Sequence, residues 1–190
     1  QGIALQIAAS KTHDLKNLIN ACKAFGDSSL LLALDGLTDP QNLGAIIRSA
    51  EALGAQGLIL PQRRSAGLTG SVAKVAAGAL EHLPVARVVN LNRSLEQLKN
   101  EGYTVVGLAE EGPSTLSELK YQGPLVVVVG SEDKGISLIT RRLCDHLVRI
   151  PLKGVTTSLN ASVATSIFLY EVARSRWMRS ISGQDPSPRL

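Results

Sequence analysis

Aromatic residues are scarce in this sequence. Only six of its 190 residues are Phe, Trp or Tyr, whereas 17 are Gly. A nucleic-acid surface that stacks successive bases on rings needs rows of such side chains. The composition therefore argues against a stacking platform, and contact with a polyanion would have to rely on charge and hydrogen bonds.

Cysteine is nearly absent as well. Cys22 and Cys144 are the only two, they lie far apart, and the chain has three His and no CxxC pair. This scarcity argues against a disulfide framework or a structural zinc site and fits a reducing compartment. We predict that the chain is cytoplasmic, that it holds no metal, and that both thiols are small core side chains.

Long hydrophobic runs are also missing. The most apolar segments, residues 30–34 (LLLAL) and 124–129 (PLVVVV), are far shorter than the ~20 residues that a helix needs to cross a bilayer. We therefore predict that this is not a membrane protein. Its 44% hydrophobic and 19% charged residues are typical of one globular domain that buries a full core.

The sequence lacks a methionine at its start. Its single Met is Met178, and residue 1 is Gln1. We therefore expect that residue 1 is not a translation start, and that further residues precede it in the whole protein.

Positive charge is concentrated in one part of the chain. The formal net charge is +4, with a pI of about 9.3. Residues 1–119 hold 10 Lys and Arg against 11 Asp and Glu, whereas residues 120–190 hold 10 against 5. All of the positive excess thus lies in the last third, which indicates either a surface that faces a polyanion or a merely solvated face.

Apolar runs alternate with segments of helical period along the chain. This alternation predicts one α/β domain, a mostly parallel sheet flanked by helices. The expected strands are residues 30–35, 57–61, 85–90, 104–109, 125–130 and 147–152, and the expected helices are residues 42–53, 70–80, 94–101, 138–144 and 159–177. The strand with four consecutive valines is expected at the centre of the sheet, buried on both faces.

The two ends of the chain differ from the expected functional domain, residues 28–178. Residues 1–27 contain a strand-like start, QGIALQI, and one amphipathic helix, which predicts a lead-in rather than a separate domain. The apolar face of that helix consists of Leu15, Leu18, Ile19 and Cys22. Residues 179–190 contain Ser, Gly and two Pro with little to bury, which predicts a disordered tail.

Sites in open α/β sheets lie at the carboxyl ends of the strands, so the loops there are the first place to look for chemistry. The loop after the first expected strand reads LDGLTDPQNLGA, which contains neither a GxGxxG pattern nor a P-loop. No HExxH, GxSxG or paired set of metal ligands appears elsewhere. Hydride transfer, nucleotide hydrolysis and zinc-dependent hydrolysis therefore have no support.

This first loop leads into a helix with one unusual residue. Asp39 and Pro40 are a typical cap and first-turn pair, and capping alone would account for Asn42. The apolar stripe that follows is centred opposite Arg48, so Arg48 points away from its own core. Arg48 either pairs with Glu51 in solvent or contacts an anion or phosphate near a neighbouring subunit or substrate.

Two later loops also carry polar residues. In GSEDKGIS, glycines bracket Glu132 and Asp133, so a ligand that is rich in hydroxyls or positively charged could approach the backbone. The two acids could equally cap the helix that follows. After the sixth expected strand, Ser158 is the expected N-cap of the last helix and small residues follow it. Packing explains Asn160, in the first turn, less easily.

Three segments together resemble the motifs of the SpoU branch of the SPOUT RNA methyltransferases. They are LDGLTDPQNLGAIIRSAEALGA, VVVVGSEDKGIS and VRIPLKGVTTSLNASVATSIFLYE, in the order that the branch has. The resemblance covers about residues 28–177. Within the branch, the chain most resembles bacterial enzymes that methylate a guanosine ribose 2′-hydroxyl in 23S ribosomal RNA, and the segments QGIALQI and RRSAGLTGSVAKVAAGALEHLPVARVVNL support this closer match.

This resemblance implies an α/β fold of the SPOUT type, with a deep C-terminal trefoil knot. It also implies S-adenosyl-L-methionine as cofactor, RNA as substrate, a homodimer with sites near the subunit interface, and a small RNA-binding domain ahead of residue 1. Carried over by position, the catalytic set is Asn42, Arg48, Glu132, Ser158 and Asn160, and backbone groups of Gly130, Ile150 and Leu159 bind the cofactor. Asp133 and Lys134 depart from the branch, since many relatives have Gly at the first position.

The residue types suggest how this set would work. A guanidinium is a reluctant base, so we predict that Arg48 grips the target phosphate and stabilises the developing alkoxide, while the proton leaves through that phosphate or water. The other four side chains would position the ribose and one another. Two alternatives stay open: an enzyme of the same branch that methylates a ribose 2′-hydroxyl of transfer RNA, and a non-catalytic RNA or ribosome-assembly binder.

Overall fold

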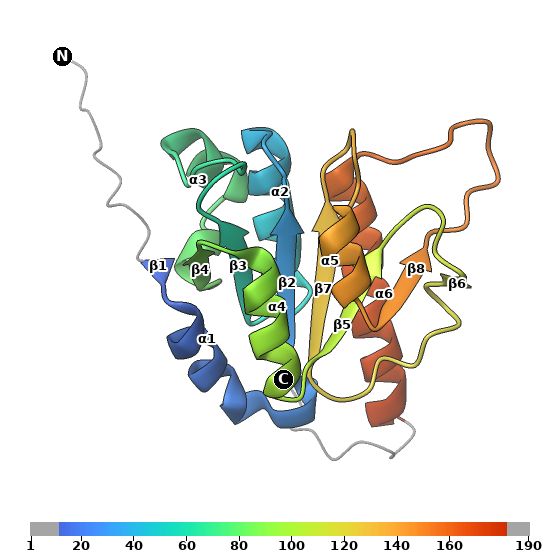
Figure 1. Cartoon of the computed structure of the whole chain (residues 1–190), viewed down its shortest axis with the longest axis horizontal. Helices are drawn as coiled ribbons and strands as arrows, with labels where there is room; N and C mark the ends of the chain where they lie inside the picture. The colour runs from blue at the N-terminus through green and yellow to red at the C-terminus, as the bar shows by residue number, and fades with distance from the viewer. Residues whose placement is uncertain (1–11, 182–190) are drawn as a thin grey trace.

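The computed structural model describes residues 12–181, which fold around an eight-stranded parallel β-sheet (Figure 1). The strand order is β1-β4-β3-β2-β7-β5-β8-β6, and every neighbouring pair is parallel. The strands are β1 (Thr12–His13), β2 (Leu30–Asp35), β3 (Gly57–Pro61), β4 (Val85–Val88), β5 (Thr104–Leu108), β6 (Ser114–Thr115), β7 (Leu125–Gly130) and β8 (His146–Arg149). This confirms the predicted α/β fold with a parallel sheet.

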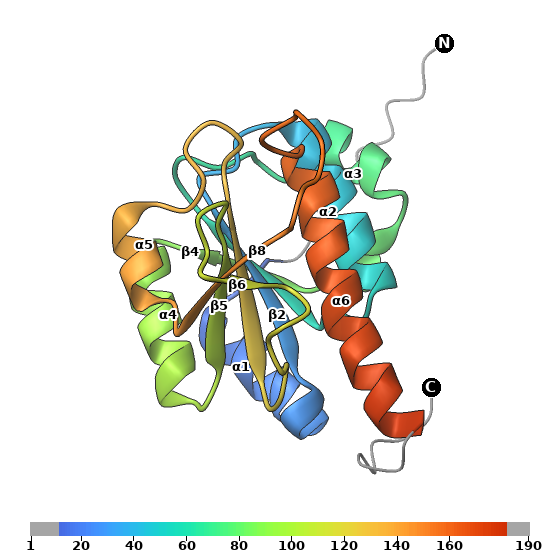
Figure 2. The same cartoon turned by 90° about the vertical axis from the view of Figure 1, so that its right-hand side faces the viewer.

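Helices cover both faces of the sheet. Figure 2 shows α2, α3 and α6 on one face, and α1, α4 and α5 on the other. Their bounds are α1 (Leu15–Cys22), α2 (Pro40–Ala52), α3 (Gly70–Ala76), α4 (Leu91–Asn100), α5 (Leu138–Leu143) and α6 (Ala161–Ile181), with short 3-10 helices η1 (Lys23–Ser28) and η2 (Ala79–Glu81). The four apolar residues predicted to share a face of α1 are all buried.

The central strand β7 is buried along its whole length, as its run of valines predicts. Val127 and Val129 pack into the core under α2 and α6, whereas Val126 and Val128 pack into the core under α1 and α4. A parallel strand between two helical layers has no face for polar side chains, so it reads as a continuous apolar run.

Local chemistry moves several of the expected boundaries. β8 ends at Arg149 rather than at residue 152, since Pro151 has no N–H to add to the ladder. α4 starts at Leu91 rather than at residue 94, because Asn90 Oδ1 caps it by accepting a hydrogen bond from the N–H of Arg93 at 3.1 Å. The two-residue strands β1 and β6 were not expected from the sequence pattern.

The last helix is longer than its pattern indicates. α6 runs to Ile181 rather than to residue 177, so the first three residues of the expected tail, 179–181, are helical. The rest of that tail, residues 182–190, lies outside the described residues, as does the QGIALQI start. Within residues 12–181, no helix combines the length and apolarity that crossing a lipid bilayer requires.

Two adjacent strands, β2 and β7, send their connections to opposite sides of the sheet. β2 continues through α2 to β3 on one side, whereas β7 continues through α5 toward β8 on the other. Such a divergence opens a crevice at the carboxyl ends of the two strands, where ligands bind in open α/β sheets. The loops after β2 and β7 carry two of the three motifs, so the topology brings these motifs together.

Aromatic packing fixes α6 against this frame. Phe168 is fully buried, and its ring lies 6.1 Å from that of Tyr121, whose hydroxyl donates to the carbonyl of Leu116 at 2.7 Å. Near the other end of the helix, Arg176 donates to the carbonyl oxygens of Ser28 (2.5 Å) and Gly123 (3.0 Å). The helix is thus anchored both by apolar burial and by charged hydrogen bonds.

We expect Phe168→Ala to lower the free energy of unfolding by about 3–5 kcal/mol, because it removes a fully buried ring and leaves a cavity. Val89→Ala is the control, since Val89 is 83% exposed and its truncation should change stability by less than about 0.5 kcal/mol. Urea unfolding followed by circular dichroism measures both. Equal effects of the two substitutions would contradict this packing.

Both cysteines are free thiols, Cys22 buried and Cys144 half-buried. Burial and, second to it, the neighbouring Asp145 carboxylate raise the pKa of Cys144 to about 11. Burial also raises the pKa of Cys22. Among residues 12–181, no group of three or more His, Cys, Asp or Glu side chains is placed to hold a metal ion.

We expect Cys144 in the folded protein to react slowly with iodoacetamide at pH 8, because a raised pKa leaves little of the reactive thiolate at that pH. The rate should increase steeply only as the pH approaches 11. Mass spectrometry of native and urea-unfolded protein measures the rate at each pH. Equal rates at pH 8 in the two states would show that the thiol is not protected.

Candidate active site

One carboxylate oxygen joins the three motifs. Glu132 Oε1 accepts hydrogen bonds from Asn42 Nδ2 at 2.5 Å and from Asn160 Nδ2 at 2.8 Å. The same Asn160 nitrogen donates to Asn42 Oδ1 at 3.0 Å. Asn42 and Glu132 are 90 residues apart in the sequence, and Asn42 and Asn160 are 118 apart. The fold therefore assembles a compact polar cluster from three separate loops.

Asn42 reaches this cluster from the first turn of α2. Asp39 is the N-cap, its Oδ1 accepting from the N–H of Gln41 at 3.0 Å, and Pro40 occupies the first helical position. Asn42 itself is only 6% exposed. A buried amide needs partners for its polar atoms, and the cluster supplies them to both the donor and the acceptor of Asn42.

Glu132 is presented by a tight turn after β7. Ser131 and Gly135 pair across the turn, with N–H to O distances of 3.2 and 2.8 Å. The turn folds back so closely that a Cβ on Gly130 would lie 1.9 Å from the carbonyl carbon of Gly135. Gly135 itself has φ +61°, a conformation that favours glycine. Asp133, near the tip, is exposed.

Asn160, and not Ser158, caps α6. Asn160 Oδ1 accepts from the N–H groups of Ser162 (2.9 Å) and Val163 (3.3 Å), while its Nδ2 holds the cluster. The prediction of Ser158 as N-cap is therefore wrong: the helix begins at Ala161, and Ser158 is exposed in the preceding loop. The negative Glu132 lies at this helix N-terminus, where the helix dipole stabilises it.

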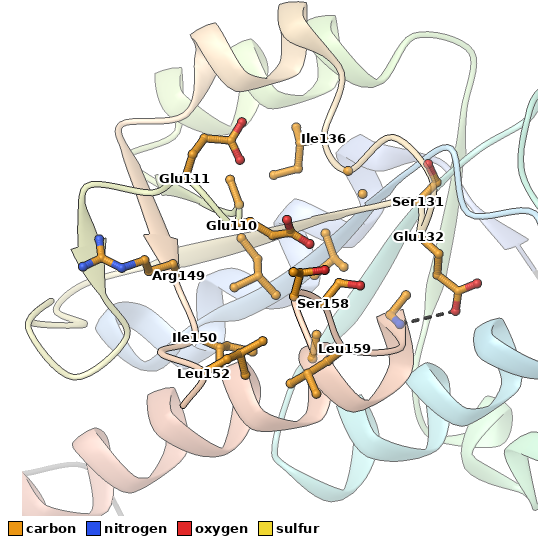
Figure 3. A pocket seen from close by; sticks show the side chains of 18 of the residues that line it. Glu110, Glu111, Ser131, Glu132, Ile136, Arg149, Ile150, Leu152, Ser158 and Leu159 are labelled. Atoms are coloured by element: carbon orange, nitrogen blue, oxygen red, sulfur yellow. Dashed lines mark hydrogen bonds between the residues drawn. The ribbon is translucent and has the colours of Figure 1, made fainter. Parts of the chain in front are cut away.

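A pocket of about 700 Å³ opens beside the cluster, between the loops that follow β5, β7 and β8 (Figure 3). The three residues expected to bind a cofactor, Gly130, Ile150 and Leu159, all line it. Glu132 and Ser158 line it as well. Because ligand pockets span ~300–1,000 Å³, its size suits a nucleoside-sized ligand.

The pocket also contains charged residues that sequence reasoning missed: Glu110, Glu111, Arg141 and Arg149. Arg141 forms an ion pair with Glu111 and lowers the pKa of that carboxyl. Arg149 Nη1 donates to the carbonyl oxygens of Gly112 (2.5 Å) and Pro113 (2.9 Å), which fastens the pocket wall. Glu110 and Glu111 directly follow an expected strand, so the rule that sites lie at the carboxyl ends of strands could have found them.

Arg48 lies apart from the cluster. It follows Asn42 by six residues, which turns it by roughly 240° around the helix, and it is not among the pocket-lining residues. Its side chain is exposed, as the opposite apolar stripe predicts. In the described part of the chain it makes no ion pair with Glu51 or with any other residue. Its neighbour Ser49 accepts from Ser166 Oγ at 2.8 Å, which places this part of α2 beside α6.

We expect Gly130→Ala to displace the turn that carries Glu132, because the new Cβ would overlap the backbone of Gly135. The displacement should lower the free energy of unfolding by about 1–3 kcal/mol. Gly70→Ala is the matched control, since a Cβ there meets nothing within 4 Å. Urea unfolding and a crystal structure of the variant measure the effect. If the turn does not move and the free energy of unfolding does not fall, the close contact between Gly130 and Gly135 is contradicted.

The sequence matches a known family over most of its length. The sequence model of the SpoU rRNA methylase family matches residues 29–170. An uncharacterized tRNA/rRNA methyltransferase of Synechocystis sp. is 53% identical over 176 residues, which are 93% of this chain and 46% of that protein. The chain spans about half the length of this relative and of two similar Mycobacterium proteins.

Solved structures agree with the sequence match. The SpoU methyltransferase AviRb from Streptomyces viridochromogenes, in complex with AdoMet, superposes with a TM-score of 0.75 at 33% identity and covers 80% of this chain and 62% of its own. An RNA 2′-O ribose methyltransferase superposes with a TM-score of 0.71 at 28% identity and covers 78% and 57%. Since the family match takes in all three loops of the polar cluster, this chain belongs to the SpoU methylase family.

Proposed function

We propose that this chain transfers the methyl group of S-adenosyl-L-methionine to a ribose 2′-hydroxyl of RNA, in the first instance a guanosine of 23S ribosomal RNA. The main support for the proposal is that Asn42, Glu132 and Asn160 form hydrogen bonds with one another. The pocket beside them is lined by Gly130, Ile150 and Leu159. A similar SpoU methyltransferase binds AdoMet, and another similar structure is a 2′-O ribose methyltransferase.

The pocket fits a cofactor of this kind. Gly130, Ile150 and Leu159 line it, and their backbone groups are where a flat base would be held. The lining holds four acidic side chains, Glu110, Glu111, Glu132 and Asp133, against three basic ones, Lys134, Arg141 and Arg149. This small excess of negative charge favours a positively charged ligand. Bound there, S-adenosyl-L-methionine supplies an activated methyl group on a cationic sulfur.

The polar cluster is suited to orient the target ribose. Both amide nitrogens are held on Glu132 Oε1, whereas Oε2 accepts no hydrogen bond from residues 12–181 and stays available to a hydroxyl. The hydroxyl of Ser158, on the pocket wall, is exposed and equally available. Since the sulfonium methyl is already activated, holding the 2′-oxygen in line with it is the main task left to the protein.

We further propose that the protein acts as a homodimer in which Arg48 serves the partner's site. Arg48 is exposed on α2, beside α6. One stripe of α6 exposes apolar side chains, and contiguous apolar surface of this kind marks interfaces. Its members are Val163, Ile167, Tyr170, Trp177 and Met178. Arg48 would grip the target phosphate and stabilise the developing alkoxide, while the proton leaves through that phosphate or water.

A trefoil knot is part of the same proposal, with residues 28–178 as the catalytic domain. In the sheet, β5 lies between β7 and β8. After β8 the chain runs back through residues 150–160, so that the N-terminus of α6 reaches Glu132 and Asn42. Threading of the C-terminal segment under the loop that precedes β7 would give this arrangement, and the pocket would lie between the threaded loops.

To test the activity, the protein is incubated with labelled S-adenosyl-L-methionine and separate ribosomal and transfer RNA pools, and the modified nucleotide is mapped. We expect label in 23S ribosomal RNA, on the 2′-oxygen of a guanosine. Label in transfer RNA alone would support the related transfer-RNA enzyme instead. RNA binding without any transfer would favour a non-catalytic binder.

We expect Arg48→Ala to reduce methyl transfer by at least about 100-fold, because the developing negative charge loses its cation, while calorimetric affinity for S-adenosyl-L-methionine stays nearly unchanged. The matched control is Arg93→Ala, since Arg93 is an exposed residue of α4. We expect this variant to keep full activity. Mixing the inactive Arg48→Ala and Asn42→Ala variants should restore about a quarter of the activity, since half of the dimers are mixed and each has one intact site. No restoration would contradict the shared site.

A further inference from the structure

The loop between β3 and α3 carries two adjacent arginines that the proposed chemistry does not use. β3 ends at Pro61, and Arg63 and Arg64 follow in a turn where both are exposed. Figure 1 shows this loop at the same edge of the sheet as the start of α2 and the start of α6. Arg63 and Arg64 are therefore on the edge that holds the polar cluster.

Both ends of this loop are fastened to the frame. The N–H of Gln62 donates to the carbonyl of Val88 at 2.8 Å, and the N–H of Ala66 donates to the carbonyl of Leu37 at 2.8 Å. Ser65 Oγ donates to the carbonyl of Pro61. Leu37 lies in the loop that leads into α2, so the arginine loop is tied to the segment that positions Asn42.

The backbone of the turn is unusual at Arg64. Arg64 has φ +57°, and within residues 12–181 Ala77 is the only other non-glycine residue with a positive φ. A side chain with a Cβ is disfavoured in this region, and residues held there cluster at ligand-binding sites. Glycine would relieve the strain, yet the sequence has an arginine here, and the turn directs its side chain into solvent.

Within residues 12–181, neither arginine is neutralised by another side chain. Across the described residues, Arg63 and Arg64 take part in no hydrogen bond and no ion pair. Asp39, the acid in the loop that leads into α2, is engaged in capping that helix. Two unpaired guanidinium groups on a fixed turn have the planar donor geometry that matches phosphate oxygens.

The spacing of the strands sets the distance between this loop and the turn that carries Glu132. β3, β2 and β7 are consecutive neighbours in the sheet, and neighbouring strands are ~4.8 Å apart. The end of β3 is therefore about 10 Å from the end of β7, which presents Glu132. An RNA strand whose target ribose lies at the polar cluster would bring its flanking phosphates over the ends of β2 and β3.

We infer that residues 62–66 form a phosphate-binding loop for the RNA substrate, with Arg63 and Arg64 contacting the backbone beside the target nucleotide. The inference rests on the proposed function for the identity of the polyanion. Recognition here is by charge and donor geometry, because the loop QRRSA has no aromatic residue on which a base could stack.

The test is the salt dependence of binding to protein-free 23S ribosomal RNA, measured without cofactor. Each phosphate contact adds about 0.7–0.9 to the slope of log K against log salt, so Arg63→Gln/Arg64→Gln should reduce the slope by roughly 1.4–1.8. Affinity should fall by about 10-fold or more near 0.15 M salt, while the affinity for S-adenosyl-L-methionine is unchanged. At saturating RNA, methyl transfer should return toward the wild-type rate.

The matched control is Lys16→Gln/Arg93→Gln, which removes the same charge from exposed positions on α1 and α4, on the opposite face. Its slope and affinity should stay close to those of the unmodified chain. Equal losses in the two double variants would overturn the inference, because they would reflect net charge alone. Unchanged binding in Arg63→Gln/Arg64→Gln would overturn it too, even if the unmodified chain methylates RNA. If no variant transfers a methyl group but the difference in slope remains, only the proposed reaction is contradicted.

Discussion

The hydrogen bonds that converge on Glu132 Oε1 hold the candidate site together. Asn42 and Asn160 donate to this single oxygen from opposite ends of the sequence, and the N–H of Ala161 at the start of α6 lies 3.4 Å away. A carboxylate that accepts several hydrogen bonds at a helix N-terminus is well stabilised. Without this carboxylate, Asn160 would still bond Asn42, but the turn after β7 would lose the hydrogen bonds that Glu132 accepts from both helices.

The sheet topology makes this convergence possible. β2 and β7 are adjacent, but their helices leave on opposite faces, so the loops after them face each other across a crevice. The close return of the turn onto Gly130 then brings the exposed Glu132 within hydrogen-bond distance of Asn42 on α2. The arginine loop after β3 lies at the same edge of the sheet, so the proposed cofactor pocket and the proposed phosphate contact would share that edge with the polar cluster.

Sequence reasoning found the strands because a buried parallel strand is a continuous apolar run, as Val126–Val129 illustrate. It also placed Arg48 on the outer side of α2, since the 3.6-residue period fixes orientation. It missed the start of α6, because Ser158 and Asn160 are equally good caps and only the contacts with Glu132 and Asn42 favour Asn160. The roles of Arg149 and the strained Arg64 depend on contacts or backbone angles that no local pattern encodes.

A crystal structure of the chain with bound S-adenosyl-L-methionine tests the central claim most directly. The account predicts that the cofactor occupies the pocket lined by Gly130, Ile150 and Leu159, and that the Asn42–Glu132–Asn160 cluster is unchanged beside it. Cofactor bound elsewhere, or a cluster that comes apart when the cofactor binds, would contradict it.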